Sequence, residues 1–480
     1  MKNSRKKHSA YKTGRKFGEW TLVKRLGSGG NGVVWKVTRP GHEPHAIKLL
    51  TTINAEAYAR FKIETETLEK LGNTVGIIPL IEKYIPDLSS GVAPWFVMPI
   101  AMPFNKVIND LPPLERVIEF IKLGEILSKL HNQRIAHRDI KPANFLYLDG
   151  QPCFSDFGLV KYPDRINITR PKRDVGAKFT MAPEMRRNAS EADGLPADVY
   201  SFSKSLWIAL TREELGFDGQ YNPVSALSLS NYMSGLYTTK LDRLLVECTD
   251  PDPALRPAID DVVLRLQEWT NIIKNFHKQN AIEWNELTQK LFPLGAPSQT
   301  TWSDLDAICA VLSEVAKVPA LNHMFYPNGG GNTITNVSRA GEDGMIELHI
   351  GYRVAEILKP SKLTYESFGN DTNWSYFRLE AEPIEASGVD GAMDSDNSRE
   401  TLTEIEPGLY VSYRHWDENE FNGETLPKSA RLVSRYLKGA FVFFSTSSAY
   451  NGDSSTYDGR HNKMTEEQFR NYIKRNSTPR

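Results

Sequence analysis

The chain has 480 residues, of which 40% are hydrophobic and 24% charged, a globular composition that excludes a mostly disordered or fibrous protein. Its 58 Lys and Arg residues nearly balance 59 Asp and Glu, and a net charge of -1 argues against bulk electrostatic binding to nucleic acid or to a membrane. Three cysteines, an odd number, argue against a disulfide framework and favour a reducing cytoplasmic location.

Residues 1–18 are predicted to form a basic tail. The first sixteen positions hold seven Lys or Arg residues and no acid, and no apolar core follows, so the segment does not resemble a signal peptide. We expect it to be solvated, with an anion-binding arm as the alternative. No apolar run reaches the roughly 20 residues that a membrane span requires, so none is expected.

Residues 19–98 are predicted to be rich in strands, with one helix. Short β-type runs cover residues 20–26, 33–38 and 45–50, and a glycine cluster separates the first two, which favours a hairpin. Apolar residues recur at helical spacing over residues 54–71.

The pattern becomes helical from about residue 112, where a long amphipathic helix is predicted. Another helix is expected after Pro257, because proline suits the first helical turn. Residues 273–300 are expected to be a helical linker. Beyond a helix that Ser303 would cap, apolar residues alternate with polar ones, so residues 301–480 are predicted to form a separate α+β domain.

A glycine-rich segment connects the first two predicted strands and contains Gly27, Gly29, Gly30 and Gly32. Glycines let the backbone approach a phosphate chain closely and present N–H groups to it. Because the segment lies between two strands, it fits a hairpin loop that covers phosphates, whereas a dinucleotide fingerprint would lead from a strand into a helix. A plain glycine-rich turn is the alternative.

A lysine in the third predicted strand is the next candidate. Ala46 and Lys48 are two residues apart in a strand and therefore share a face, which leaves room for a flat base beside a cation. Holding such a lysine in place requires a carboxylate. Glu64 on the following helix is the favoured partner, with Glu56 and Glu66 as alternatives. An ordinary exposed strand lysine is the competing interpretation.

The segment 137–144 follows the long amphipathic helix and carries acid–base and cation-binding groups. Asp139 can orient an attacking hydroxyl and accept its proton, and Lys141 can neutralise a moving phosphoryl group. Asn144 and Asp156 offer oxygen ligands that suit Mg²⁺, which takes few protein ligands. Capping a turn (Asp139) or stabilising a loop (Asp156) are the structural alternatives.

Taken in order, these motifs resemble the signature of eukaryotic-like (Hanks-type) serine/threonine protein kinases. The resemblance covers residues 19–272 and continues with an Ala-Pro-Glu sequence ending at Glu184 and with Arg256, which the family would join as an ion pair. It implies an α+β fold with two lobes, a β-rich N-lobe at 19–98 and a helical C-lobe at 99–272.

The resemblance also implies ATP and Mg²⁺ as cofactors and a role for each motif. The glycines would cover the ATP phosphates, and Lys48, paired with Glu64, would hold the α- and β-phosphates. Asp139 would be the catalytic base, and Asn144 and Asp156 the Mg²⁺ ligands. The residues implied to surround the adenine are Val34, Ala46, Leu146, the gatekeeper Met98 and the hinge that ends at Ala101.

The chain departs from the family pattern before Ala-Pro-Glu, where Ala177 replaces the usual threonine. The missing hydroxyl normally helps to fix the catalytic aspartate and lysine, and Thr180 is a nearby candidate to replace it. Arg138 belongs to the type of catalytic loop that usually awaits a phosphate. A permanent negative partner, Asp174, and an autophosphorylation site, Thr169, are the two alternatives for this chain.

We therefore predict transfer of the ATP γ-phosphoryl group to Ser or Thr hydroxyls of proteins, including autophosphorylation. Lys141 after the catalytic aspartate is typical of Ser/Thr enzymes in the family. Protein substrates are the expected partners, with neither a membrane nor nucleic acid. The alternative is a nucleotide-binding scaffold that regulates the C-terminal domain.

The predicted C-terminal domain resembles no family that we recognise. Three glycines at 329–331 favour a hairpin loop over a phosphate cradle, since neither a helix nor a lysine follows. The acidic stretch 390–400 lacks the internal glycine of a Ca²⁺-binding loop, which favours a solvated loop.

Overall fold

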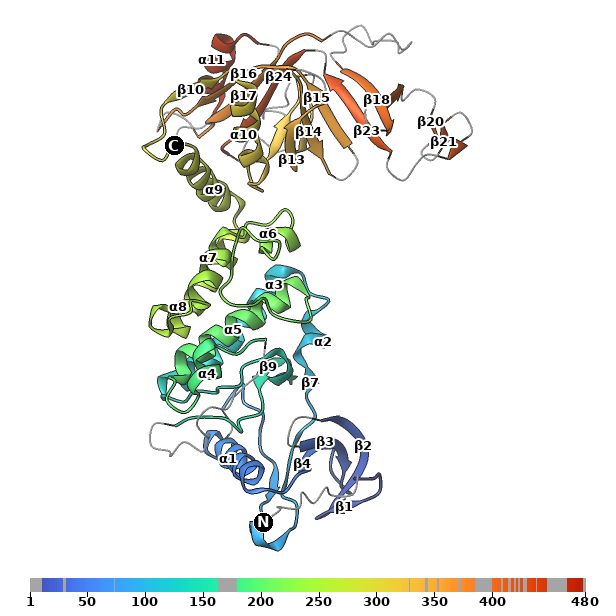
Figure 1. Ribbon diagram of the computed structural model, residues 1–480, viewed down its shortest axis with the longest axis vertical. Helices are drawn as coiled ribbons and strands as arrows, with labels where there is room; N and C mark the ends of the chain where they lie inside the picture. Colours follow the sequence, from blue (N-terminus) through green and yellow to red (C-terminus); the bar gives the residue numbers. More distant parts are fainter. Residues whose placement is uncertain are drawn as a thin grey trace. The chain divides into compact units, whose positions relative to one another are not determined.

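The computed structural model divides the chain into two compact units, Met1–Asn271 (unit 1) and Ile272–Arg480 (unit 2) (Figure 1). The structure describes residues 11–28, 32–72, 74–162, 179–327, 329–341, 344–351, 354–369, 373–384, 399–406, 409–412, 416–417, 420–421, 424–425, 430–436, 438–446 and 464–477.

The first part of unit 1 is a six-stranded sheet with one long helix. The strand order is β1-β2-β3-β4-β6-β5, and the described pairings are antiparallel. The strands are β1 (Lys16–Phe17), β2 (Trp20–Ser28), β3 (Gly32–Thr38), β4 (His45–Leu50), β5 (Glu82–Tyr84) and β6 (Trp95–Pro99). Helix α1 (Ala55–Leu71) begins after Asn54, whose side chain accepts a hydrogen bond from the Ala57 N–H.

The end of the segment expected to be a basic tail is packed onto this sheet. Tyr11 and Phe17 are both buried in the cluster that contains Trp20, Trp35 and Trp95. The Tyr11 hydroxyl donates a 2.8 Å hydrogen bond to the Leu50 carbonyl. Residues 11–18 are therefore part of the folded N-lobe.

The rest of unit 1 is mainly helical, so the predicted two-lobed arrangement and α+β class are confirmed. Its helices are α2 (Phe104–Ile108), α3 (Pro113–Asn132), α4 (Pro183–Asn188), α5 (Gly194–Thr211), α6 (Leu229–Tyr232), α7 (Thr239–Cys248) and α8 (Ile259–Ile273), with short 3-10 turns at 88–90, 142–144 and 253–255. A small sheet consists of β7 (Met102–Pro103), which follows the N-lobe in sequence, and of β8 (Phe145–Leu148) and β9 (Gln151–Phe154), which follow α3.

Helix α5 is the centre of the C-lobe. Almost all of its residues are buried, including the large Phe202 and Trp207. Helix α3 packs against it closely, because Gly124 places no side chain between α3, Phe202 and Val263. A buried helix of this kind forms the frame from which loops can be held precisely.

Unit 2 contains two larger sheets, ordered β10-β16-β17-β24-β11-β12 and β13-β14-β15-β23-β18-β19, and a small one, β20-β21-β22. Its helices are α9 (Phe276–Leu291), α10 (Leu305–Ala316) and α11 (Glu466–Asn476). The strands are β10 (Gln299–Trp302), β11 (His323–Phe325), β12 (Gly331–Thr333), β13 (Asn336–Arg339), β14 (Ile346–Ile350), β15 (Val354–Leu358), β16 (Pro360–Glu366), β17 (Tyr376–Ala381), β18 (Arg399–Glu406), β19 (Leu409–Ser412), β20 (Trp416–Asp417), β21 (Glu420–Phe421), β22 (Glu424–Thr425), β23 (Arg431–Tyr436) and β24 (Gly439–Phe444).

The helix expected to be a linker belongs to the core of unit 2. Trp284 and Leu287 of α9 are buried in the same cluster as Ile308 and Leu312 of α10. Helix α10 begins one residue later than expected, since Asp304, and not Ser303, accepts the capping bond from Ala307 N–H. The glycines at 329–331 lie at the turn between β11 and β12, as expected for a hairpin.

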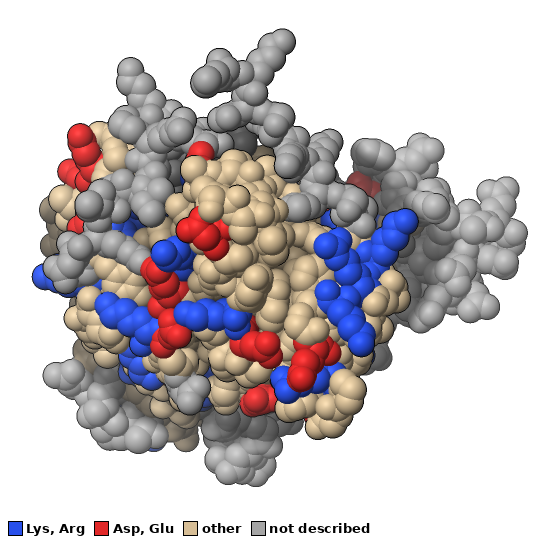
Figure 2. All heavy atoms as spheres, turned by 90° about the horizontal axis from the view of Figure 1, so that it is seen from below, with Lys and Arg blue, Asp and Glu red and all other residues tan. Residues whose placement is uncertain are grey.

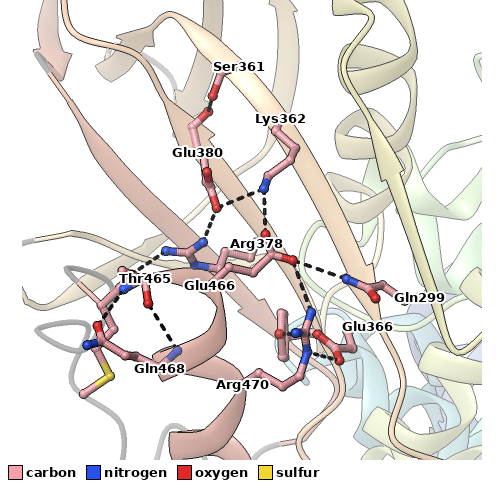
Figure 3. Close-up of polar contacts among 12 residues, drawn as sticks. Gln299, Ser361, Lys362, Glu366, Arg378, Glu380, Thr465, Glu466, Gln468 and Arg470 are labelled. Carbon is pink, nitrogen blue, oxygen red and sulfur yellow. Dashed lines mark hydrogen bonds and ion pairs between the residues drawn. The ribbon is translucent and has the colours of Figure 1, made fainter.

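Helix α11 is held to the rest of unit 2 by both apolar and charged contacts, and Figure 3 shows the charged ones. Phe469 and Ile473 are fully buried against aromatic residues of the sheet. Arg470 Nε donates to Glu366 Oε1 at 2.5 Å, and Lys362 Nζ donates to Glu466 Oε2 at 2.7 Å. The last described helix is thus an integral part of the unit. No helix in the described ranges is long and apolar enough to cross a membrane.

Gly124→Ala is expected to destabilise unit 1 by about 1–2 kcal/mol, although alanine favours helices. The new Cβ would lie 2.6 Å from Val263 Cγ2, so the α3–α8 contact must open. Pulse proteolysis in urea, with fragments identified by mass spectrometry, measures the change. Val263→Ala should reduce the loss in the double variant, and the exposed Lys129→Ala should have no effect. A stabilised Gly124→Ala variant would contradict this packing argument.

Candidate active site

Three charged side chains from distant parts of unit 1 meet at one point. Lys48 of β4 donates from Nζ to Glu64 Oε1 and Oε2 at 2.6 and 2.7 Å. The same Nζ lies 3.3 Å from Oδ1 of Asp156, which follows β9. Glu56 and Glu66, the alternatives considered for Lys48, instead pair with Arg60 and Lys62 along α1.

Lys48 and Asp156 keep their charges because each stabilises the charged form of the other. Burial by itself would lower the pKa of Lys48, but Asp156 and Glu64 outweigh it and raise this pKa above its usual value. Lys48 in turn is the main cause of a lowered pKa for Asp156. Burial raises the pKa of Glu64 to about 7, an effect that Lys48 opposes. A protonated Lys48 and an ionised Asp156 therefore face each other at neutral pH.

The sheet register places the predicted adenine and phosphate residues on one face. Directly opposite residues of neighbouring strands share a face. Val34 is opposite Lys48, and Ala46 is opposite Met98, so these four side chains lie on the face that carries the Lys48–Glu64 pair. Gly27 in β2 is directly opposite Val34, so it belongs to the same row of residues across the sheet as Val34 and Lys48.

The other predicted nucleotide residues lie at the start of β3, between β6 and β7, and in the small sheet. Gly32 begins β3, where an added Cβ would lie 3.1 Å from the Leu49 carbonyl oxygen, so the backbone there is closely packed. Ala101 lies between β6 and β7, and Leu146 of β8 pairs with Pro103 of β7. Gly29 and Gly30 lie outside the described residues.

Two neighbouring side chains hold one oxygen of the Asp139 carboxylate, and the other oxygen has no hydrogen-bond donor among the described residues. Its carboxylate Oδ2 accepts from Lys141 Nζ at 2.8 Å and from Asn144 Nδ2 at 3.0 Å. Its other oxygen, Oδ1, is buried and accepts no hydrogen bond within the described part of the chain. Burial raises the pKa of Asp139, and Lys141 opposes that rise. A buried acceptor without a donor is costly in a folded protein unless a ligand supplies the donor.

Asp198, at the start of α5, fixes the backbone that carries Asp139. Its two oxygens accept from the His137 and Arg138 N–H groups at 2.6 and 2.7 Å, and His131 Nε2 lies 3.2 Å away. In the sequence Asp198 opens a helix rich in apolar residues, but the sequence analysis assigned it no partner. A carboxylate expected to be buried in such a helix must accept hydrogen bonds, and that requirement is the signal that could have identified its role.

The donor set fits a divalent cation near Asp156. Phe157 is fully buried and packs on His137 with 4.7 Å between ring centroids, which directs Asp156 toward Lys48. Asp156 holds a left-handed backbone conformation, with φ of 63°, that is uncommon outside glycine. Asn144 donates through its amide nitrogen, so its oxygen stays available as a ligand. One carboxylate and one amide oxygen suit Mg²⁺, which retains water or phosphate ligands.

The expected Glu184–Arg256 ion pair is present. Arg256 is buried and donates from its two terminal nitrogens to the two Glu184 oxygens at 2.6 and 2.9 Å. Thr180, the candidate to replace the hydroxyl missing at Ala177, instead donates to the Ile140 carbonyl at 3.2 Å. It therefore supports the catalytic loop through the backbone next to Asp139 and not through the Asp139 carboxylate.

Several residues of the sequence analysis lie outside the described residues. They are Thr169, Asp174, Gly176, Ala177, Asp390, Asp394 and Asp396. Arg138 itself is described: it is buried and donates to the Ala189 carbonyl. The choice between Asp174 and Thr169 as its partner stays a prediction.

Comparisons with known proteins agree with this geometry. The profile of the protein kinase domain matches residues 20–265. A serine/threonine-protein kinase/receptor of Acanthamoeba polyphaga mimivirus is 27% identical over 52% of this chain, and the serine/threonine-protein kinase AfsK of Streptomyces griseus 26% over 41%. The dual specificity protein kinase shkB of Dictyostelium discoideum is 30% identical over 50%. The matched segments span 16%, 25% and 38% of these three relatives.

Asp198→Asn is expected to loosen the catalytic loop and to cost about 2–3 kcal/mol, because the new amide would oppose a backbone N–H donor. Hydrogen–deuterium exchange over residues 131–140, together with urea unfolding, measures the effect. Asp193→Asn is the matched control, since Asp193 caps α5 through Leu195 N–H and asparagine caps equally well. Equal protection in both variants would show that Asp198 does not hold the loop.

Proposed function

Because the chain belongs to the protein kinase family, we propose that it transfers the γ-phosphoryl group of ATP to serine and threonine hydroxyls of proteins, itself included. The observation that carries this proposal is the state of Asp139. Its carboxylate is fixed by Lys141 and Asn144, while Oδ1 remains buried and without a donor. An acceptor hydroxyl would supply that donor.

Asp139 acts as the base in this reaction. A hydroxyl that donates to Oδ1 is oriented for attack, and its proton passes to the carboxylate as the phosphoryl group is transferred. The raised pKa of Asp139 makes it a better proton acceptor than an exposed aspartate. Lys141, at 2.8 Å from the carboxylate, is placed to balance the negative charge that arrives with the phosphoryl group.

Lys48 and Glu64 would hold the triphosphate. The double hydrogen bond from Lys48 to Glu64 fixes the ammonium group at one place under the glycine-rich segment that begins at Gly27. A cation so fixed can hold the α- and β-phosphates without being reoriented when the nucleotide binds. The N–H groups of Gly27, Gly29 and Gly32 are the proposed cover for the phosphates.

Asn144 and Asp156 would hold Mg²⁺, which when bound would spread the charge of the phosphates. Asp156 is suited to this role because Lys48 keeps it ionised. Val34, Ala46 and Leu146 would enclose the adenine, with Met98 limiting its depth and Ala101 on the hinge beside it. Small Ala46 opposite Met98 leaves a flat space on that face of the sheet.

The preference for serine and threonine rests on Lys141 and on the names of the mimivirus and Streptomyces relatives. The alternative, a nucleotide-binding scaffold without transfer, is not favoured, because the geometry retains a fixed, unsatisfied base. A scaffold would have no use for that buried oxygen, whose isolation costs stability.

Incubation of the full chain with ATP labelled at the γ-phosphate and a mixed protein acceptor should label peptides. Asp139→Asn should lower the rate at least roughly 100-fold by removing the base. Lys48→Ala should lower it as strongly by releasing the phosphates. Asp149→Asn, at an exposed turn, is the matched control and should keep full activity. Mass spectrometry of the labelled residues reports serine, threonine or tyrosine; nucleotide binding without any transfer would favour the scaffold.

Glu64→Gln should lower kcat/KM roughly 10- to 100-fold, because the ion pair with Lys48 is replaced by a weaker hydrogen bond from the ammonium group to a neutral amide oxygen. Glu66→Gln on the same helix removes the same charge without touching Lys48 and should leave kcat/KM unchanged. Steady-state kinetics of phosphate transfer distinguish the two. If both variants retain full activity, Lys48 does not depend on Glu64.

A further inference from the structure

Three lysines share the sheet face that carries the nucleotide residues. Lys36 of β3 is opposite Ala46 of β4 and opposite Lys24 of β2. Lys16 of β1 is opposite Thr21 of β2, and Thr21 is opposite Thr38 of β3. Because Thr38 and Lys36 are two residues apart in β3, Lys16 lies on the same face as Lys36. We call Lys16, Lys24 and Lys36 the lysine face. It continues the Val34–Ala46 surface toward the free edge of the sheet.

Two of these lysines form a like-charge pair at close range. Residues directly opposite in an antiparallel sheet have Cβ atoms about 5 Å apart, and like charges there destabilise the sheet. Lys24 is exposed and Lys36 half-buried. Among the described residues, the lysine face makes no ion pair, although Arg39 and Lys83 of the same lobe do. The positive charge of this face is therefore available to an external anion.

The surroundings extend the basic character and add apolar area. Arg15, next to β1, and Arg25 of β2 are exposed at this edge of the sheet, Arg25 on the opposite face because it pairs with Trp35. Figure 2, which shows this end of the molecule, has a group of Lys and Arg toward one edge. Val23, before Lys24, and Leu26, after Arg25, are 39% and 46% exposed. A mixed basic and apolar surface fits a protein segment better than a phosphate backbone.

We propose that the lysine face docks acidic segments of protein substrates, so that this chain phosphorylates proteins with Asp- or Glu-rich stretches near the accepting hydroxyl. The proposal rests on the proposed function and names its substrate class. An acidic stretch on Lys16, Lys24 and Lys36 relieves the repulsion between Lys24 and Lys36. It also holds the substrate beside the Val34–Ala46 surface, next to the proposed nucleotide.

A polypeptide is favoured over nucleic acid or a membrane by the rest of the chain. The net charge of -1 provides no general attraction to large polyanions, so a local patch must act through a short, specific contact. Nucleic acid binding would further gain from aromatic side chains exposed for stacking, but Trp20, Trp35 and Trp95 of this sheet are buried.

The test compares serine peptides that differ only in flanking residues: acidic, neutral and basic. Wild type should phosphorylate the acidic peptide with a kcat/KM roughly tenfold above the neutral one, from three exposed charge contacts. The advantage should appear in KM and shrink between 50 and 300 mM NaCl, because exposed charges are screened. Equal kcat/KM for acidic and neutral peptides would overturn the proposal.

Substitutions of the three lysines test whether the preference for the acidic peptide arises on the lysine face. The triple change Lys16→Gln, Lys24→Gln and Lys36→Gln should abolish the preference, raising KM for the acidic peptide and leaving the neutral peptide unchanged. The matched control neutralises three exposed lysines elsewhere, Lys129, Lys274 and Lys278, and should keep the preference. Replacing the lysine face by arginine should also keep it. A preference that survives the glutamine variant overturns the assignment of this face.

A direct binding measurement tests the docking of acidic segments independently of phosphate transfer. A fluorescent Glu-rich peptide should bind wild type and Asp139→Asn equally, and the glutamine variant at least roughly tenfold more weakly. Binding that depends on the lysine face, without transfer to any peptide, would contradict the proposed function and leave the docking inference standing. Tighter, face-dependent binding of single-stranded RNA or of phosphatidylserine vesicles than of the peptide would overturn it.

Discussion

The position of a single ammonium group organises this site. Lys48 Nζ lies between Glu64 at 2.6 Å and Asp156 at 3.3 Å, and these residues come from a strand, a helix and a loop. Leaving one partner of such a buried pair alone costs about 3–5 kcal/mol, so none of the three elements can move away cheaply. The same contact keeps Asp156 ionised and so determines which side of the cleft can hold a cation. Helix α1 thereby contributes a side chain to the proposed nucleotide site, in addition to packing on the sheet.

The C-lobe fixes its half of the site by a different means. There the backbone itself is held, because Asp198 accepts two N–H groups immediately before Asp139. Asp198 is on α5, most of whose residues are buried. The N-lobe therefore positions a charge through side-chain ion pairs, and the C-lobe positions Asp139 through its backbone. Under the proposed function, the first group would meet the nucleotide and the second the accepting hydroxyl.

Local periodicity was sufficient to predict the elements and contacts that depend on short stretches. The β3 and β4 strands, α1 and the pairing of Lys48 with Glu64 follow from periods of two and 3.6 and from the need for a carboxylate. Asp198 stands out in the sequence where it opens an apolar helix, but its bonds to backbone N–H groups 60 positions away were not predicted, because a backbone N–H is present at nearly every residue and leaves no mark in the sequence. The order of strands in unit 2, with β15 parallel to β23, depends on pairings across about 80 residues that no local pattern records. Segment 11–18 was predicted to be part of a basic tail, because basic residues dominate the first sixteen positions and hide the two aromatic residues, Tyr11 and Phe17, that pack on the sheet.

The overall charge of the chain argues against the binding of anions, whereas the positions of Lys24 and Lys36 favour it. The two arguments apply at different distances from the protein. The 58 basic and 59 acidic side chains nearly cancel one another far from the protein. Salt also screens the field of exposed charges beyond a Debye length of about 10 Å. At contact distance only the nearest groups matter, and there Lys24 and Lys36 are opposite each other without a counter-ion in the described residues. A sequence free of functional demands would relieve that pair by one substitution, since either position tolerates a neutral side chain at a strand surface. Its presence beside the cleft is the kind of local conflict that marks a surface evolved for a partner.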